Sequence, residues 1–195
     1  MAKKRAELEA RSGTHVCPWW LVKSFDNFLR PYIHNPDKLF GPYVKPGMTV
    51  LDVGCGRGFA TLGLARLVGE AGKVIAADLQ PEMLEMVRAR ARDDGLSRRI
   101  VTHQCRSDRI GVTDRTDFAL AFFMVHEVPD QAAFIAQIAK ILRPSGRFFV
   151  AEPLVHTTRA GFDRIVSRAQ EAGLSVLERP KVVFGRAVVF VKKGR

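Results

Sequence analysis

The apolar and polar positions of the chain follow two alternating periods, which predicts alternating strands and helices. From residue 49 onward, short runs of β-branched and aromatic residues are followed by segments with apolar positions at helical spacing. The predicted strands are 49–53, 74–77, 100–104, 118–123 and 148–151, and the predicted helices are 59–68, 81–94, 131–142 and 160–172. This alternation predicts an α/β protein with a doubly wound, Rossmann-like sheet and helices on both faces.

The two ends of the chain depart from this alternation. At the carboxyl end, the strand-like runs 175–184 and 187–192 are joined by Gly185-Arg186, which predicts a terminal antiparallel hairpin. Near the amino end, apolar residues recur at helical spacing before Pro31, and a second short helix is expected within 35–44.

Pro46-Gly47 separates the two parts of the chain, so we expect an N-terminal helical arm at 1–45 and an α/β domain at 46–195. The aromatic residues of the arm are expected either to cover a ligand pocket as a lid or to pack a helix against the core. These residues are Trp19, Trp20, Phe25 and Phe28.

The composition suits a single folded domain. The chain has 195 residues, of which 47% are apolar, and no apolar run approaches the roughly 20 residues that span a bilayer. Its first ten residues contain no apolar stretch of the signal-peptide type. We therefore expect a cytoplasmic protein without a membrane partner.

The net charge of +11 and the isoelectric point of about 10.1 leave two interpretations open. The basic residues are scattered along the chain, which is typical of a solvated basic surface. The same charge would also attract an anionic partner such as RNA.

The three cysteines, Cys17, Cys55 and Cys105, are widely spaced and lack the spacing of a metal site. They are expected to be small apolar fillers in a reduced protein, with thiol or soft-metalloid chemistry as the alternative.

The segment from Gly54 to Gly58 is the first candidate binding element. Its three glycines follow a strand and open a helix, where backbone N–H groups can meet a ligand closely. Asp78 ends the next strand about 20 residues later, the position of an acid that binds ribose hydroxyls. The combination predicts a nucleotide-containing ligand.

Two features argue against a dinucleotide as that ligand. The loop has the spacing GxGxG, and Phe59 occupies the position of the third glycine of a dinucleotide loop. Asp52 lies two residues before the first glycine, where a carboxylate would repel a pyrophosphate and suit an ammonium group. S-adenosylmethionine offers both a ribose for Asp78 and an ammonium for Asp52.

With these features, the sequence resembles the class I S-adenosylmethionine-dependent methyltransferases of the small-molecule type. The resemblance covers roughly residues 45–195 and rests on four segments. These are 50–58, 77–79, 116–130 and the Leu-x-Pro-x-Gly segment within 141–150. It implies a seven-stranded sheet whose last strand is inserted antiparallel.

The resemblance also implies a set of cofactor contacts. Asp52, Gly54 and Gly56 are expected near the methionine part, Asp78 on the ribose, and Leu79 on the adenine. The full expected set is Asp52, Gly54, Cys55, Gly56, Asp78, Leu79, Arg106, Ser107, Ala121 and Phe122.

The adenine contact departs from the family pattern. Arg106 stands where the family often has an aspartate that accepts from the adenine amino group. Ser107 would offer a backbone N–H, and Asp108 could substitute if the loop is shifted.

The sulfonium activates the methyl group, so the protein has mainly to align the reactants, and a base is needed only for some acceptors. His126 is the candidate base, with a local hydrogen-bonding or pocket-wall role as the alternative. Glu127 is expected to be a hydrogen-bonding partner. Glu152 and His156 face the ligand side in principle, but their spacing with His126 and Glu127 lacks a metal motif, and we expect no metal.

The segment 126–130 resembles small-molecule enzymes, and no Asn-Pro-Pro-Tyr segment for base amino groups is present. The expected function is methyl transfer to a small molecule. The alternatives are methylation of RNA or protein, and a non-catalytic cofactor-binding subunit.

Overall fold

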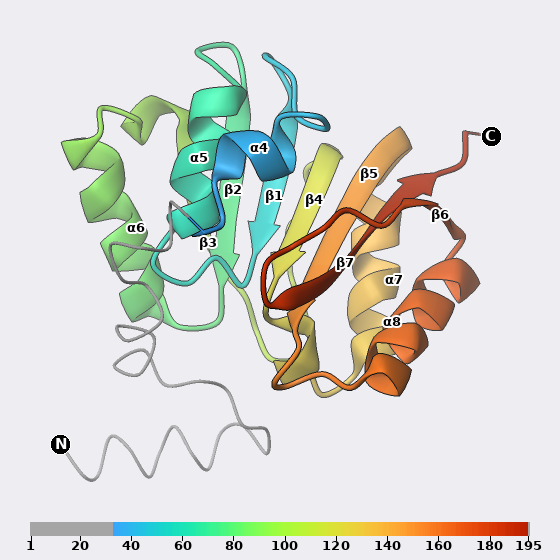
Figure 1. Ribbon diagram of the computed structural model, residues 1–195. Coiled ribbons are helices and arrows are strands. Elements are labelled where there is room, and N and C mark those ends of the chain that lie inside the picture. Colours follow the sequence, from blue (N-terminus) through green and yellow to red (C-terminus); the bar gives the residue numbers. More distant parts are fainter. Residues whose placement is uncertain (1–32, 195) are drawn as a thin grey trace, which may run out of the picture.

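The computed structural model describes residues 33–194 as one sheet between two layers of helices (Figure 1). The arm residues Trp19, Trp20, Phe25 and Phe28, with Cys17, lie outside the described residues. The strands are β1 (Thr49–Val53), β2 (Lys73–Asp78), β3 (Ile100–Gln104), β4 (Thr116–Phe122), β5 (Leu142–Pro153), β6 (Leu174–Glu178) and β7 (Gly185–Lys192). The helices are α4 (Pro36–Phe40), α5 (Phe59–Leu67), α6 (Pro81–Asp93), α7 (Gln131–Ile141) and α8 (Arg159–Glu171), with 3-10 turns η1 (Ser97–Arg99) and η2 (Val125–Glu127).

The seven strands form one sheet in the order β3-β2-β1-β4-β5-β7-β6. The first five strands of this order are parallel, and β7 lies antiparallel between β5 and β6. The predicted doubly wound sheet and the terminal antiparallel strands are therefore confirmed. The strand order reverses between β1 and β4, and ligands of such sheets bind at the carboxyl ends of the strands there.

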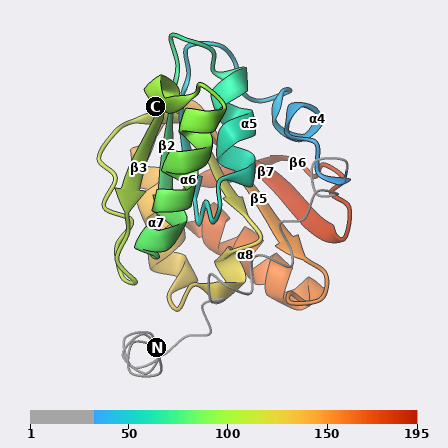
Figure 2. The same cartoon turned by 90° about the vertical axis from the view of Figure 1, so that its left-hand side faces the viewer.

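Alternating residues of each strand pack on opposite helical layers. On one face Leu51, Val53 and Ala121 join a core with α7 and α8. On the other face Val50 and Leu120 join a core with α4 and α5, and α6 covers β2 beside them. Figure 2 views the molecule from the side of α6. Burial on both faces explains why the central strands are almost entirely apolar.

Several predicted boundaries shift for local reasons. The predicted strand 175–184 ends at Glu178, because Pro180 lacks an N–H and the chain then turns, with Gly185 N donating to the Val182 carbonyl oxygen at 3.1 Å. The predicted strand 148–151 extends over all of β5, which begins directly where α7 ends, with irregular pairing around Ser145 at a φ of 62°. Within residues 33–194, no helix is both long and apolar enough to cross a membrane.

Candidate functional site

The loop after β1 is shaped by three glycines with positive φ. Gly54, Gly56 and Gly58 have φ values of 69°, 52° and 82°, a region that side chains disfavour. A Cβ on Gly54 would lie 2.7 Å from the Met124 side chain, and one on Gly58 would lie 2.9 Å from Val87. A Cβ on Gly56 would meet no atom within 4 Å. Gly56 is therefore the glycine of this loop that borders open space.

Asp78 is bound directly to this loop. Its carboxylate accepts hydrogen bonds from the backbone N–H of Gly56 at 2.9 Å and of Gln80 at 3.0 Å, and the residue is 8% exposed. Burial raises the pKa of Asp78, although these backbone N–H groups oppose the rise. The acid predicted to bind ribose thus lies beside the glycine predicted to admit the ligand.

Asp52, in β1, is hydrogen-bonded to the first turn of α5. It is 2% exposed, and the Thr61 hydroxyl donates to its carboxylate at 2.6 Å. Thr61 was missed by the sequence reasoning, because one threonine within an apolar helix carries no signal of its own. Asp52 and Asp78 place two buried carboxylates on neighbouring strands at the same end of the sheet.

The two described cysteines, Cys55 and Cys105, are free thiols whose pKa values are raised. Burial, with the charges of Asp78 and Asp52, raises the pKa of Cys55 well above its ordinary value. Burial, with the charge of Asp78, raises the pKa of Cys105 to about 12. A buried thiol with a raised pKa is a poor nucleophile, which supports the interpretation of these residues as small apolar fillers.

The loop after β3 is tied to the end of β2. Cys105 N donates to the Asp78 carbonyl oxygen at 2.8 Å, and the Gln104 amide donates to the Leu79 carbonyl oxygen at 3.4 Å. Arg106 and Asp108 then lie on an exposed turn, where their charged groups approach to 3.4 Å. Ser107 is exposed on the same turn.

The end of β4 positions its residues in different directions. Ala121 is fully buried in the sheet between Val53 and Val150. The Phe122 ring packs against Phe40 and His34 on the α4 side, at centroid distances of 6.1 and 5.4 Å. The expected contribution of Phe122 to the cofactor site would therefore have to come from its backbone.

Phe123 and Met124 follow directly and were missed from the sequence. Phe123 has a φ of 62°, although its N–H still donates to the Ala151 carbonyl oxygen at 2.8 Å. This conformation is unusual for a bulky residue, and such outliers concentrate at functional sites. It places the Met124 side chain over Gly54.

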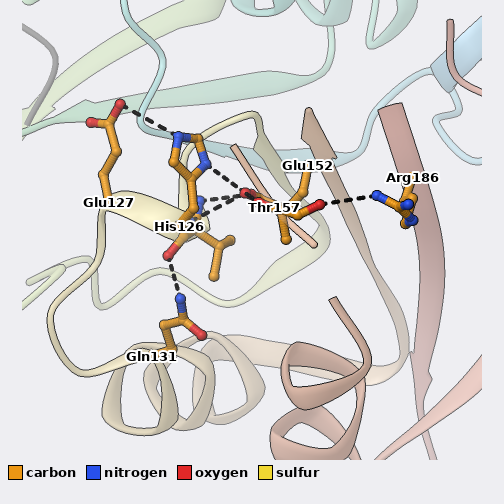
Figure 3. A network of polar contacts seen from close by, with 7 residues as sticks. His126, Glu127, Gln131, Glu152, Thr157 and Arg186 are labelled. Carbon is orange, nitrogen blue, oxygen red and sulfur yellow. Dashed lines mark hydrogen bonds and ion pairs between the residues drawn. The ribbon is translucent and has the colours of Figure 1, made fainter. Parts of the chain in front are cut away.

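Glu152, near the end of β5, organises the loop after β4 (Figure 3). Its fully buried carboxylate accepts from the backbone N–H groups of Val125 and His126 at 2.8 and 3.2 Å. The Thr157 hydroxyl donates to it at 3.1 Å, and His126 Nδ1 lies 2.5 Å from Oε2. From the sequence, Glu152 and His126 were both expected on the ligand side of the sheet. Their hydrogen bond could not be predicted, because it requires β4 and β5 to be neighbours in the sheet.

The pKa of the His126 side chain is raised above its ordinary value. Burial works to lower the pKa of His126, but the hydrogen bond and charge of Glu152 outweigh it, with Glu127 contributing, so the pKa is raised. The His126 Nε2 atom lies 3.9 Å from the Glu127 carboxylate, and the ring stacks on His156 at a centroid distance of 5.3 Å.

A cavity of about 450 Å³ opens beside the two stacked rings. Its lining includes His126, His156 and Thr157 together with Arg164 and Arg168 of α8. Within residues 33–194, no three His, Cys, Asp or Glu side chains are grouped so that they could hold a metal ion.

A protein-family model and a sequence relative both match this chain. A family model described as a methyltransferase domain matches residues 44–179. The ubiquinone/menaquinone biosynthesis C-methyltransferase UbiE of Escherichia coli is 32% identical over 124 residues, which are 62% of this chain and 49% of the relative. The match thus spans about half the length of that relative.

Two solved structures share the fold. A SAM-dependent methyltransferase from Aquifex aeolicus has a TM-score of 0.81 at 24% identity, covering 90% of this chain and 99% of that one. A SAM-dependent O-methyltransferase from Thermotoga maritima has a TM-score of 0.68 at 22% identity, covering 83% of this chain and 65% of that one.

Proposed function

The chain belongs to the methyltransferase domain family, with the class I S-adenosylmethionine-dependent fold, and from this premise we propose that it methylates a small molecule. The observation that carries the methyl-donor part of this proposal is the link between Asp78 and Gly56. A buried carboxylate is held by the backbone of a glycine that borders open space, with N–H groups on both of its oxygens. Each oxygen keeps a lone pair for a hydroxyl donor such as a ribose.

The residues present fit S-adenosylmethionine, which supplies a methyl group on a positively charged sulfur. Asp78 would accept from the ribose hydroxyls, and Asp52 would attract the methionine ammonium directly or through water. Gly54, Cys55 and Gly56 would follow the methionine part with their backbone. Leu79 would pack on the adenine, Arg106 and Ser107 would contribute from the loop after β3, and the backbone of Ala121 and Phe122 would line the cofactor from β4.

Replacing Asp78 by asparagine is expected to weaken binding of S-adenosylmethionine by roughly 10- to 100-fold, because hydrogen bonds to a charged group contribute about 1.5–3 kcal/mol. Isothermal titration calorimetry of the full chain measures this. The matched control is Asp114→Asn, which changes an exposed aspartate paired with Lys73 away from the site. Equal affinities of the two variants would refute the assignment of Asp78.

His126 is the residue we propose as the general base for acceptors that must lose a proton. Glu152 holds the Nδ1 side of the ring, and this leaves Nε2, near Glu127, as the atom that would take the proton. The charge of Glu152 would also stabilise the imidazolium that results. The cavity beside His126 and His156 is the proposed acceptor site.

The raised pKa of His126 predicts opposite pH trends for activity and stability. A base must be unprotonated, so the rate is expected to rise as pH passes through the raised pKa, above the ordinary 6.5. The extra stability of the charged pair is fully present below about pH 6.5 and is lost as pH rises through the folded-state pKa. His126→Asn keeps a hydrogen-bond donor for Glu152 and should remove both trends.

The measurements are unfolding by urea and methyl transfer, each followed from pH 5.5 to 9. The control is His103→Asn, which removes an imidazole that contacts the Ile110 carbonyl oxygen on the β3 side. A pH profile of the rate that His126→Asn leaves unchanged would exclude the base role.

The small-molecule acceptor is supported by the segment 126–130 and by the relative named for ubiquinone and menaquinone biosynthesis. Calorimetry with S-adenosylmethionine and its demethylated product tests the proposal as a whole. Binding of neither compound at millimolar concentration would refute it. A non-catalytic subunit would bind the cofactor without transferring the methyl group to any acceptor.

Two further predictions from the sequence remain predictions. The cytoplasm is the proposed location, and the net charge of +11 would attract an anionic partner such as RNA. Methylation of RNA would require binding that weakens steeply as salt is added.

A further inference from the structure

Four apolar side chains project from two adjacent loops at the carboxyl edge of the sheet. Leu154 and Val155 follow β5 and are 48% and 85% exposed, and Val183 and Phe184 precede β7 and are 49% and 71% exposed. Leu154 N donates to the Phe184 carbonyl oxygen at 2.9 Å, so the two loops lie side by side. We name these four residues the apolar tip. Its Val155 directly precedes His156, which lines the proposed acceptor site.

Phe184 is exposed in an unfavourable backbone conformation. Its φ is 56°, a region that glycine and asparagine adopt readily and that is an outlier for a bulky residue. A polar residue would suit both the backbone and the solvent better. An aromatic ring held there at a cost in stability points to a contact outside the folded domain.

A basic groove adjoins the apolar tip. It is a cavity of about 750 Å³ between the first turn of α8 and the segment leading into β7. Its lining contains the cations Arg159, Arg179, Lys181 and Arg186 and one anion, Asp163. The same edge of the molecule therefore carries exposed apolar side chains next to an excess of positive charge.

The geometry points to peripheral binding of an anionic membrane surface through the apolar tip and the basic groove. Apolar side chains enter the interfacial region of a bilayer, while arginine and lysine attract anionic headgroups, and stable attachment needs both signals. This departs from the expectation of no membrane partner, because the sequence separates 154–155 from 183–184 and only the fold joins them. Docking by this edge would turn the proposed acceptor site toward the bilayer.

Sedimentation of the full-length protein with vesicles tests the inference without any measurement of activity. Binding is expected to vesicles that contain phosphatidylglycerol and to be much weaker to pure phosphatidylcholine. Val155→Ser combined with Phe184→Asn should lower the vesicle affinity roughly tenfold or more, since each removes buried apolar area. Asparagine at position 184 also suits the positive φ.

The charge contribution is tested separately. Arg179→Gln with Lys181→Gln should lower the affinity roughly 10- to 30-fold, because each cation near an anionic surface contributes about fivefold. The matched controls are Arg92→Gln with Arg98→Gln, two exposed cations near the opposite edge, and Val101→Ser, which changes a 50% exposed valine of β3. Circular dichroism and the melting temperature verify that each variant is folded.

Three results would overturn the inference. The first is that the unaltered protein fails to sediment with anionic vesicles, and the second is that the control variants lose as much affinity as the test variants. The apolar tip could instead bind a second copy of the chain, in which case analytical ultracentrifugation would show a dimer that Val155→Ser with Phe184→Asn dissociates, with no loss of vesicle binding.

Discussion

Replacing Gly56 by alanine is expected to weaken binding of S-adenosylmethionine by about 100-fold. Gly56 has a φ of 52° and borders open space in the loop between β1 and α5, so an added methyl group would occupy the volume assigned to the ligand. Relaxing the loop to remove this overlap would disturb the Gly56 N–H bond to Asp78. Calorimetric titration measures the change, with the demethylated product as a second ligand.

The control for this prediction is Gly47→Ala. Gly47 also has a positive φ, 82°, and a Cβ there also meets no atom within 4 Å, but it lies before β1, at the opposite edge of the sheet. Both substitutions should cost a similar amount of backbone strain, about 1–2 kcal/mol. Only Gly56→Ala should lose ligand affinity. Equal affinities of the two variants would show that the ligand does not approach Gly56.

Replacing Glu152 by alanine is expected to lower the free energy of unfolding by about 3–5 kcal/mol, the range for breaking a buried, hydrogen-bonded charge pair. The side chain is fully buried and receives donors from Val125, His126 and Thr157. These donors would lose their acceptor together, and the loop after β4 would lose its anchor to β5. Urea denaturation followed by circular dichroism measures the loss.

Two variants separate the contributions at this position. Glu152→Gln keeps the shape but removes the charge, so it should cost less and should lower the pKa of His126, which NMR titration can follow. Glu171→Ala changes an exposed glutamate at the end of α8 and is expected to cost under about 1 kcal/mol. A loss for Glu152→Ala no larger than that of Glu171→Ala would contradict the buried network.

The central strands and helices were predictable because their signals are local. The apolar runs of β1 and β4 reflect burial on both faces, and Pro81 with Gly95 marks the limits of α6. The predictions were wrong where local signals conflict with pairing. The run 175–184 is apolar enough for a strand, but its pairing with β7 ends at Glu178, and Phe184 turns through a positive φ that its residue type does not indicate.

The sequence by itself determined the family, the sheet with its helical layers, and the glycine loop with Asp52 and Asp78, because each depends on residue types at short, regular spacing. Only the tertiary structure decided that Gly56 borders open space, that Glu152 holds His126, and that two loops some 30 residues apart form the apolar tip. These features depend on which strands become neighbours and on backbone angles that packing imposes. The glycine loop could therefore be predicted from its residue types, whereas the pairing of Glu152 with His126 beside the proposed acceptor site required the fold.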